Sequence, residues 1–117
     1  MDNGELAALE QVCGTPGVLG AWLAQASGSL VRSAGAPGYG PREMAPVAAA
    51  AHRILSGAGA GILELELEGG RLRAELVEDW VLVVLTGPGA DRAWVRMSCE
   101  VARPRLREAR RARPRSA

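Results

Sequence analysis

The sequence contains no lysine, a single histidine and only two cysteines among its 117 residues. A catalytic triad or a zinc site needs several such groups, so His52 alone can build neither. The spacing of Cys13 and Cys99 matches no metal-binding motif, and we expect two small buried apolar residues in a reducing compartment. The residue inventory therefore predicts no catalytic site, no metal and no cofactor.

Long apolar runs are also missing. None approaches the ~18 residues that a membrane span needs. The opening Met-Asp-Asn-Gly-Glu lacks the basic charge and the apolar segment that are typical of a signal peptide. We therefore expect a cytoplasmic protein. The 48% share of hydrophobic residues indicates one folded domain with its own core.

The net charge of +1 conceals an uneven distribution. From residue 103 onward seven arginines stand against one acid, giving +6, whereas the remaining residues carry seven arginines and twelve acids, giving −5. We expect a domain over residues 1–103 and a frayed or disordered arginine-rich tail over residues 104–117. Nucleic-acid binding by this tail is disfavoured, because the rest of the chain is acidic. The abundance of Ala, Gly and Arg suggests a GC-rich bacterial genome.

Local patterns before residue 34 predict one helix and two strands. The helix covers residues 2–13 and can be capped by Asp2 or Asn3. Residues 18–24 are apolar at nearly every position, which indicates a strand buried on both faces. A turn then leads into a returning strand at residues 30–33.

A second helix is expected to end near Ser56. Pro46 either lies in its first turn or kinks it. The glycines at 57, 59 and 61 follow this helix and open a strand, which is the wrong order for a nucleotide-binding loop. One face of the helix is apolar, and its small alanines suit close packing against another helix; this face comprises Met44, Val47, Ala48, Ala51 and Leu55.

A hairpin is predicted around residues 62–76. Acidic and apolar residues alternate strictly from 62 to 68, and Gly69-Gly70 can form a two-residue type I′ turn. That turn would place Glu66 opposite Arg73 and Glu64 opposite Glu75. The like-charged pair then requires a basic group from a helix or from a second chain. An ion-paired face is favoured over a metal or acid–base site.

The third strand of this meander is apolar on both faces, from Trp80 to Leu85. It follows a turn at Glu78-Asp79 and belongs in the middle of the sheet, with helices above and below. Asp91 can cap a last helix that Pro104 ends or bends. "GPGADR" at 87–92 precedes this helix but lacks the lysine of a P-loop. We expect an apolar stripe of Ala90, Trp94, Met97 and Val101 on that helix, and all three tryptophans, at 22, 80 and 94, packed between sheet and helices.

These elements and residues resemble the roadblock/dynein light chain family. The likeness lies in "TPGVLGAWLAQASGSLVRS", in the Ala-rich middle helix and in "GGRLRAELVEDWVLVVL". It covers roughly residues 4–103. The resemblance implies a profilin-like α/β (α+β) fold, in which a five-stranded antiparallel sheet lies between one middle helix and two terminal helices.

The resemblance also implies a homodimer in which the first meander strands pair and the middle helices pack together. A long exposed strand edge independently invites such pairing. The expected dimer interface is therefore the apolar face of the middle helix, Met44, Val47, Ala48, Ala51 and Leu55, together with Ile62, Leu63, Glu64, Leu65, Glu66, Leu67 and Glu68.

Relatives in this family regulate or anchor other proteins, and bacterial ones act on Ras-like small GTPases. We therefore expect a non-enzymatic homodimeric regulator or scaffold that binds a small GTPase or another signalling protein. The expected partner surface is the exposed side of the middle helix near Arg42, Glu43, His52 and Arg53. The alternative is a sensor that holds a small ligand under the middle helix or between sheet and helix.

Overall fold

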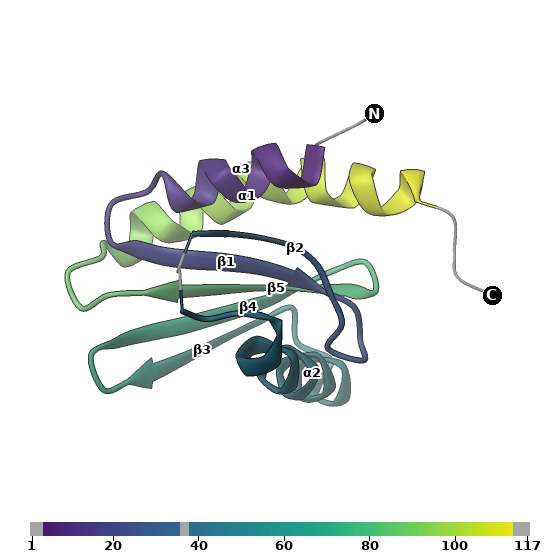
Figure 1. Ribbon diagram of the computed structural model, residues 1–117, viewed down its shortest axis with the longest axis horizontal. Helices are drawn as coiled ribbons and strands as arrows, with labels where there is room; N and C mark the ends of the chain where they lie inside the picture. The colour runs from purple at the N-terminus through teal and green to yellow at the C-terminus, as the bar shows by residue number, and fades with distance from the viewer. Residues whose placement is uncertain (1–3, 36–37, 114–117) are drawn as a thin grey trace.

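The computed structural model describes residues 4–35 and 38–113, with three helices packed on the two faces of a five-stranded sheet (Figure 1). The elements follow one another in the predicted order, and the fold class is confirmed. The expected caps Asp2 and Asn3 lie outside the described residues. The elements are α1 (Gly4–Cys13), β1 (Val18–Ala24), β2 (Leu30–Gly35), α2 (Pro41–Ala58), β3 (Ile62–Leu67), β4 (Gly70–Val77), β5 (Trp80–Thr86) and α3 (Arg92–Ala112).

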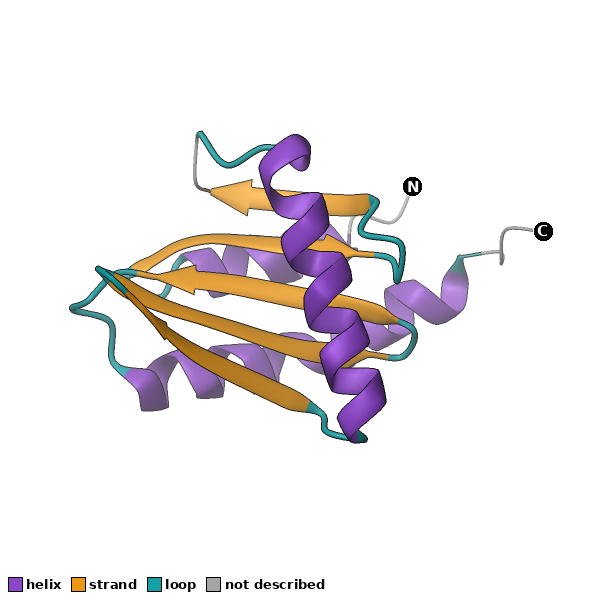
Figure 2. Ribbon diagram, turned by 90° about the horizontal axis from the view of Figure 1, so that it is seen from below, coloured by secondary structure: helices purple, strands orange, loops and turns teal. Residues whose placement is uncertain are grey.

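The sheet is antiparallel with the strand order β2-β1-β5-β4-β3. Helices α1 and α3 cover one face, and α2 crosses the other (Figures 1 and 2). Successive side chains of β5 alternate between the two resulting cores, with Leu82 and Val84 under α1 and α3, and Val81 and Val83 under α2. All four are fully buried, so β5 is the central, doubly covered strand that the apolar run predicts.

Helix α2 begins and ends as its sequence suggests. Pro41 lies in the first turn, where the missing N–H costs nothing, and Gly59 caps the C-terminus in the left-handed conformation. Pro46 lies further inside the helix, which excludes the first of its two expected positions, the first turn. The buried side chains of α2 pack onto the sheet.

The β3–β4 hairpin differs from its prediction by one residue in the turn. Leu67 pairs with Gly70, so the loop is Glu68-Gly69 and not Gly69-Gly70. Of the two loop residues only Gly69 has a positive φ, 84°, whereas a type I′ turn needs a positive φ at both central residues. Gly70 is required for another reason, because a Cβ there would lie 2.0 Å from the Thr86 carbonyl oxygen.

This change in register removes the like-charged pair. Glu64 lies opposite Arg73 and Glu66 opposite Arg71, while Ile62 lies opposite Glu75. Every acid on the strand therefore faces an arginine across the ladder. The prediction that Glu64 faces Glu75 is wrong.

Helix α3 also differs from its prediction. It passes through Pro104 and continues to Ala112, so much of the segment expected as a frayed or disordered tail over residues 104–117 is helical; residues 114–117 lie outside the described part of the chain. Pro104 lies on the exposed side, where water can bond to the carbonyl that the missing N–H leaves free. Asp91 caps the helix as expected, its side chain accepting a hydrogen bond from the Trp94 N–H at 3.1 Å.

The face that α3 buries is not the predicted one. Trp94, Met97 and Val101 are 53%, 58% and 55% exposed, whereas Trp22 and Trp80 are buried as expected. The inward face of α3 carries smaller residues than the predicted one, and these allow α3 to pack closely against α1 and the sheet. The residues that pack inward are Val95, Cys99, Ala102, Leu106 and Ala109.

Candidate functional site

Strand β3 lies at the edge of the sheet, as predicted, and pairs on one side with β4. Its other side presents backbone N–H and C=O groups that no described strand covers. Three of its side chains are apolar and exposed, with Ile62 at 46%, Leu65 at 45% and Leu67 at 45%. An exposed, apolar, six-residue edge of this kind is a ready surface for pairing with another chain.

Helix α2 covers only part of its face of the sheet (Figure 2). Leu63 packs against the core beneath α2, and strand alternation places Leu65 and Leu67 on the same face, beyond the helix. On α2 itself, Ile54 is 52% exposed. We call Ile54, Leu65 and Leu67 the α2-side patch.

The two flanks of α2 have different neighbours. His52 contacts the β4–β5 turn through its ring nitrogen Nε2, 3.0 Å from the Asp79 carbonyl oxygen. Ile54, two residues further on, points to the opposite flank because successive residues are about 100° apart around a helix. That flank faces the end of the sheet where the β3–β4 turn lies (Figure 2), so the members of the α2-side patch share one side of the molecule.

Four of the residues predicted to form the dimer interface do not lie on the surface. Met44, Ala48, Ala51 and Leu55 are 0–5% exposed and pack into the core of their own chain. These side chains are held in the core of their own chain, because the sheet needs the apolar face of α2 for itself. Val47 is half-buried at the edge of this face. The residue in the sequence that could have indicated an exposed apolar contact on α2 is Ile54, which lies outside the apolar face of that helix.

The carboxylates of β3 are neutralised on the opposite face of the sheet. Glu64 forms ion pairs with Arg73 at 3.7 Å and with Arg92 of α3 at 3.0 Å, and Glu66 pairs with Arg71 at 3.0 Å. The expected ion-paired face is confirmed. A basic group from a helix was expected beside Glu64, and Arg92 supplies it. The expectation rested on a Glu64–Glu75 pair, which the observed register does not form.

A buried ion-pair cluster lies between β4 and α3. Glu75, only 1% exposed, accepts hydrogen bonds from Arg73 at 3.3 Å and from Arg103 at 3.0 Å. The bond to Glu75 raises the pKa of Arg103. Burial, with the Glu75 charge nearby, raises the pKa of the Cys99 thiol to about 11. Cys99 is therefore the inert apolar residue that the sequence predicts, and both cysteines are free.

The predicted partner-binding residues do not gather into one cluster. The Glu43 carboxylate accepts a hydrogen bond from the Gly40 N–H at 2.9 Å and so caps α2, while His52 ties α2 to the β4–β5 turn. Arg42 and Arg53 are exposed. Their spacing of eleven residues places them on the same face of α2, about 16 Å apart.

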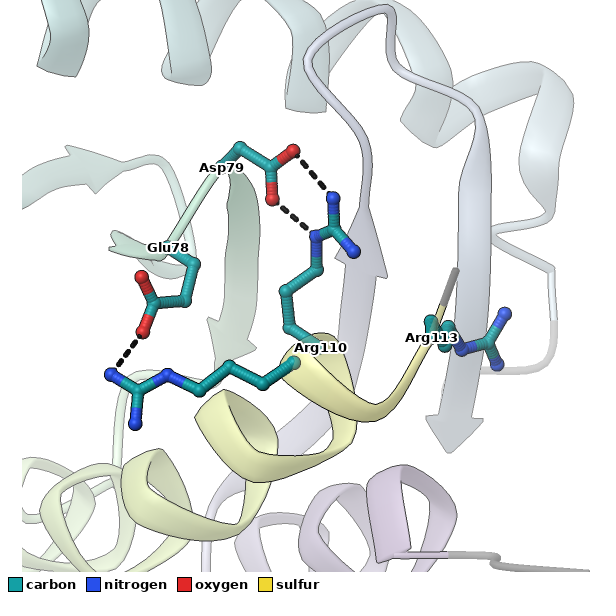
Figure 3. Close-up of a pocket in the computed structure, with 5 residues that line it drawn as sticks. Glu78, Asp79, Arg110 and Arg113 are labelled. Atoms are coloured by element: carbon teal, nitrogen blue, oxygen red, sulfur yellow. Dashed lines mark hydrogen bonds and ion pairs between the residues drawn. The ribbon is translucent and has the colours of Figure 1, made fainter. Parts of the chain in front are cut away.

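Arginines near the end of α3 hold the β4–β5 turn (Figure 3). Arg110 binds both carboxylate oxygens of Asp79, one at 2.9 Å, and Arg111 pairs with Glu78 at 2.7 Å. The guanidinium of Arg110 also lies over the Trp80 ring, 5.4 Å from its centroid. The bonds to Asp79 raise the pKa of Arg110.

Arg113 connects the end of α3 with α1. It forms an ion pair with Glu5, which also lies 3.7 Å from Arg32, and it stacks over Trp80 at 5.5 Å. Burial tends to raise the pKa of Glu5, but the hydrogen bond from Arg113 and the two positive charges lower it below its usual value. Much of the basic tail is thus used within the fold, which leaves less charge for nucleic acid.

Three surface hollows formed by described residues lie away from the space proposed for a small ligand. Hollows of about 460 Å³ and 320 Å³ flank the C-terminal half of α3, and one of about 210 Å³ lies beside the β3–β4 turn. Within residues 4–35 and 38–113, no group of three His, Cys, Asp or Glu side chains is placed to hold a metal. None of the helices described is long and apolar enough to cross a membrane.

Strand order, register and helix placement together define the Roadblock/LC7 fold. No protein-family model matches the sequence, and no curated protein sequence is similar to it. Solved structures are similar. A Roadblock/LC7 domain from Streptomyces avermitilis superimposes with a TM-score of 0.78 at 20% identity, over 88% of this chain and 93% of that one.

Two proteins of Myxococcus xanthus are also similar in structure. MglB superimposes with a TM-score of 0.76 at 18% identity, over 95% of this chain and 98% of its own. MglC gives 0.72 at 16% identity, over 91% and 98%. The resemblance to the roadblock/dynein light chain family is thereby confirmed in the fold.

Proposed function

We propose that this chain is a non-enzymatic homodimeric regulator or scaffold that binds a Ras-like small GTPase or another signalling protein. The observation that carries the proposal is the uncovered β3 edge beside the exposed α2-side patch. The fold shared with MglB and MglC, and the regulatory role that the family resemblance implies, support the same conclusion.

The dimer forms when β3 pairs antiparallel with β3 of a second chain. This pairing satisfies the free backbone groups of the edge and continues the sheet from one chain into the other. Leu65 and Leu67 are then covered by the second chain, and Ile54 packs at the same contact. A two-fold axis makes the contact self-complementary, since each chain offers the same surface.

Charge does not oppose this pairing. A two-fold ladder centred on Leu65 brings Glu64 of one chain opposite Glu66 of the other, and like charges in that position destabilise a sheet. Here Arg73 and Arg92 neutralise Glu64, and Arg71 neutralises Glu66. The arginines of β4 and α3 therefore make an acidic strand able to pair with itself.

Replacing Leu65 or Ile54 by glutamate is expected to break the dimer. Each change places a charge in a contact that pairing desolvates, and a loss of about 2 kcal/mol weakens the dimer about 30-fold. Sedimentation equilibrium measures the dissociation constant. Met97→Glu is the matched control, because Met97 is equally exposed but lies on α3, across the sheet. A monomeric wild type, or equal effects of all three changes, contradicts the proposed contact.

The outward face of α2 is the proposed surface for the partner. Arg42 and Arg53 are exposed there, whereas Glu43 and His52 are engaged at its flanks. Calorimetric titration with a Ras-like small GTPase, loaded with GDP or with a GTP analogue, tests the assignment. Arg53→Glu is expected to weaken binding at least about tenfold, whereas Arg107→Glu on α3 leaves it unchanged. Binding unaffected by Arg53→Glu contradicts this surface.

A further inference from the structure

The two edges of the sheet differ in regularity. Strand β3 forms one edge and β2 the other (Figure 2). All six residues of β3, from Ile62 to Leu67, pair in unbroken register with β4, and none of them has a positive φ. The backbone N–H and C=O groups on the outer side of such a strand are regularly spaced, so a second strand can bind them.

Strand β2 is interrupted by a β-bulge. Leu30 lies opposite Ala24 of β1, and the next paired residue of β2 is Arg32, opposite Leu23. Val31 is therefore an extra residue with no counterpart on β1. A bulge bends its strand, increases the local twist and disrupts the ladder, so the outer groups of β2 do not follow one regular row.

The far end of β2 departs from the extended conformation. Gly35 has a φ of 73°, in the left-handed region. Between this residue and the bulge, the regular part of β2 consists of Arg32, Ser33 and Ala34. The β2 edge therefore offers three regular residues for pairing, whereas the β3 edge offers six.

A charged side chain lies along the same edge. Arg32 is opposite Leu23, whose side chain is buried under α1 and α3, so the arginine turns toward that face of the sheet. Its Nη2 atom lies 3.7 Å from the Glu5 carboxylate of α1, and its side chain is 40% exposed. A strand added beside β2 would take this charge out of water, which opposes pairing.

We propose that β2 is a blocked edge, and that the bulge at Val31, with the charge of Arg32 beside it, prevents a second chain from pairing there. The sheet can then extend through β3 but not through β2.

The blocked edge limits the size of the assembly, a step that rests on the proposed dimer. Pairing through β3 uses the regular edge of each chain and leaves a β2 strand at both ends of the joined sheet. If β2 could pair, dimers would join through it into a continuous sheet of many chains, because open edges are templates for further strands. With β2 blocked, growth of the sheet stops at two chains.

An open-edge variant tests the role of the bulge. It combines deletion of Val31, which restores a regular strand, with Arg32→Thr, which removes the charge. Sedimentation velocity at increasing concentration is expected to show assemblies at least about twice the mass of the wild-type dimer.

The matched control combines Val31→Ala with Arg32→Thr. It loses the same charge and most of the same side chain but keeps the extra residue, so it is expected to assemble no further than the wild type. Circular dichroism checks that both variants are folded. A folded open-edge variant that assembles no further than this control overturns the proposal, as does equal extension of both.

Cysteine at Ser33 reports pairing of β2 directly. Ser33 is exposed and lies in the middle of the three regular residues. Cross-linking of Ser33→Cys is expected to be no faster than that of Arg107→Cys on α3, but at least about tenfold faster when the edge is opened, because paired strands bring Cα atoms within disulfide range. Rapid cross-linking of Ser33→Cys with the bulge intact overturns the proposal, whether or not the open-edge variant folds.

Failure of the blocked edge and failure of the proposed dimer have different signatures. Leu65→Glu removes pairing through β3, so the open-edge variant that also carries Leu65→Glu is expected to stop at two chains joined through β2. A wild-type chain that stays monomeric contradicts the dimer, yet the expectation for this combined variant is unchanged. If the combined variant is folded and stays monomeric, the bulge is not what keeps β2 unpaired, and the proposal is wrong.

Discussion

Ending the chain after Arg103 is expected to unfold the domain. The deletion removes Leu106, which is fully buried between α3 and the sheet, and Ala109 behind it. Truncating one buried leucine alone costs about 2–5 kcal/mol. The deletion also removes the ion pairs of Arg110 with Asp79 and of Arg113 with Glu5. Together these losses approach the whole stability of a small domain, about 5–15 kcal/mol.

Urea unfolding followed by tryptophan fluorescence measures this effect. We expect the full chain to show one cooperative transition and the chain ending at Arg103 to show none, or one at a much lower urea concentration. The matched control ends at Arg113 and keeps every described contact of α3, so it should unfold as the full chain does. Equal stability of the chain ending at Arg103 would show that residues 104–112 form the dispensable tail that the sequence suggests.

Replacing Glu75 by glutamine is expected to be the most destabilising single substitution at a charged residue. The Glu75 carboxylate neutralises Arg73, only 5% exposed, and it also binds Arg103. Arg73 then keeps only the Glu64 carboxylate, which lies 3.7 Å away and is shared with Arg92. Removing one partner of a buried ion pair and leaving the other charge poorly compensated costs about 3–5 kcal/mol.

The matched control is Glu66→Gln on the neighbouring strand. Glu66 also pairs with an arginine, but its side chain is 79% exposed, and surface pairs of this kind contribute about 0–1 kcal/mol. Chemical unfolding of both variants at neutral pH measures the contrast. Removing both buried charges, in Arg73→Met with Glu75→Leu, should restore much of the stability lost in Glu75→Gln. Similar small effects of Glu66→Gln and Glu75→Gln contradict the role of the buried cluster.

The sequence predicts the order of the elements and the layers of the fold, because their patterns are local. The apolar run of β5 predicts a strand covered on both faces, and the structure confirms it. The alternation over residues 62–68 predicts one covered face, but in β3 only Leu63 is partly buried, while Leu65 and Leu67 stay exposed. The exact turn could not be predicted in this way. Gly69 and Gly70 look alike in sequence, yet Gly70 is needed only because Thr86, distant in sequence, lies against it.

The faces of α3 show a second limit of local patterns. Trp94, Met97 and Val101 satisfy helical spacing, and so do Val95, Cys99 and Ala102. The first set was predicted to pack inward, but α3 packs beside α1 and onto the sheet with the second set. Helix α2 shows the same limit. Its most apolar face packs into the chain's own core, and Ile54 is the apolar residue that stays on the surface.

The most direct test of the contact across β3 is a cysteine scan of the edge strand. In a two-fold antiparallel ladder, residues opposite one another at the axis have Cα atoms about 4.5–5.5 Å apart, within the range of a disulfide. The native thiols should interfere little, since burial raises the pKa of both Cys13 and Cys99. Cysteine placed in turn at residues 64, 65 and 66 is predicted to cross-link rapidly at one of them under mild oxidation, whereas Met97→Cys does not. Cross-linking no faster in β3 than at Met97→Cys would contradict the dimer and the function proposed from it.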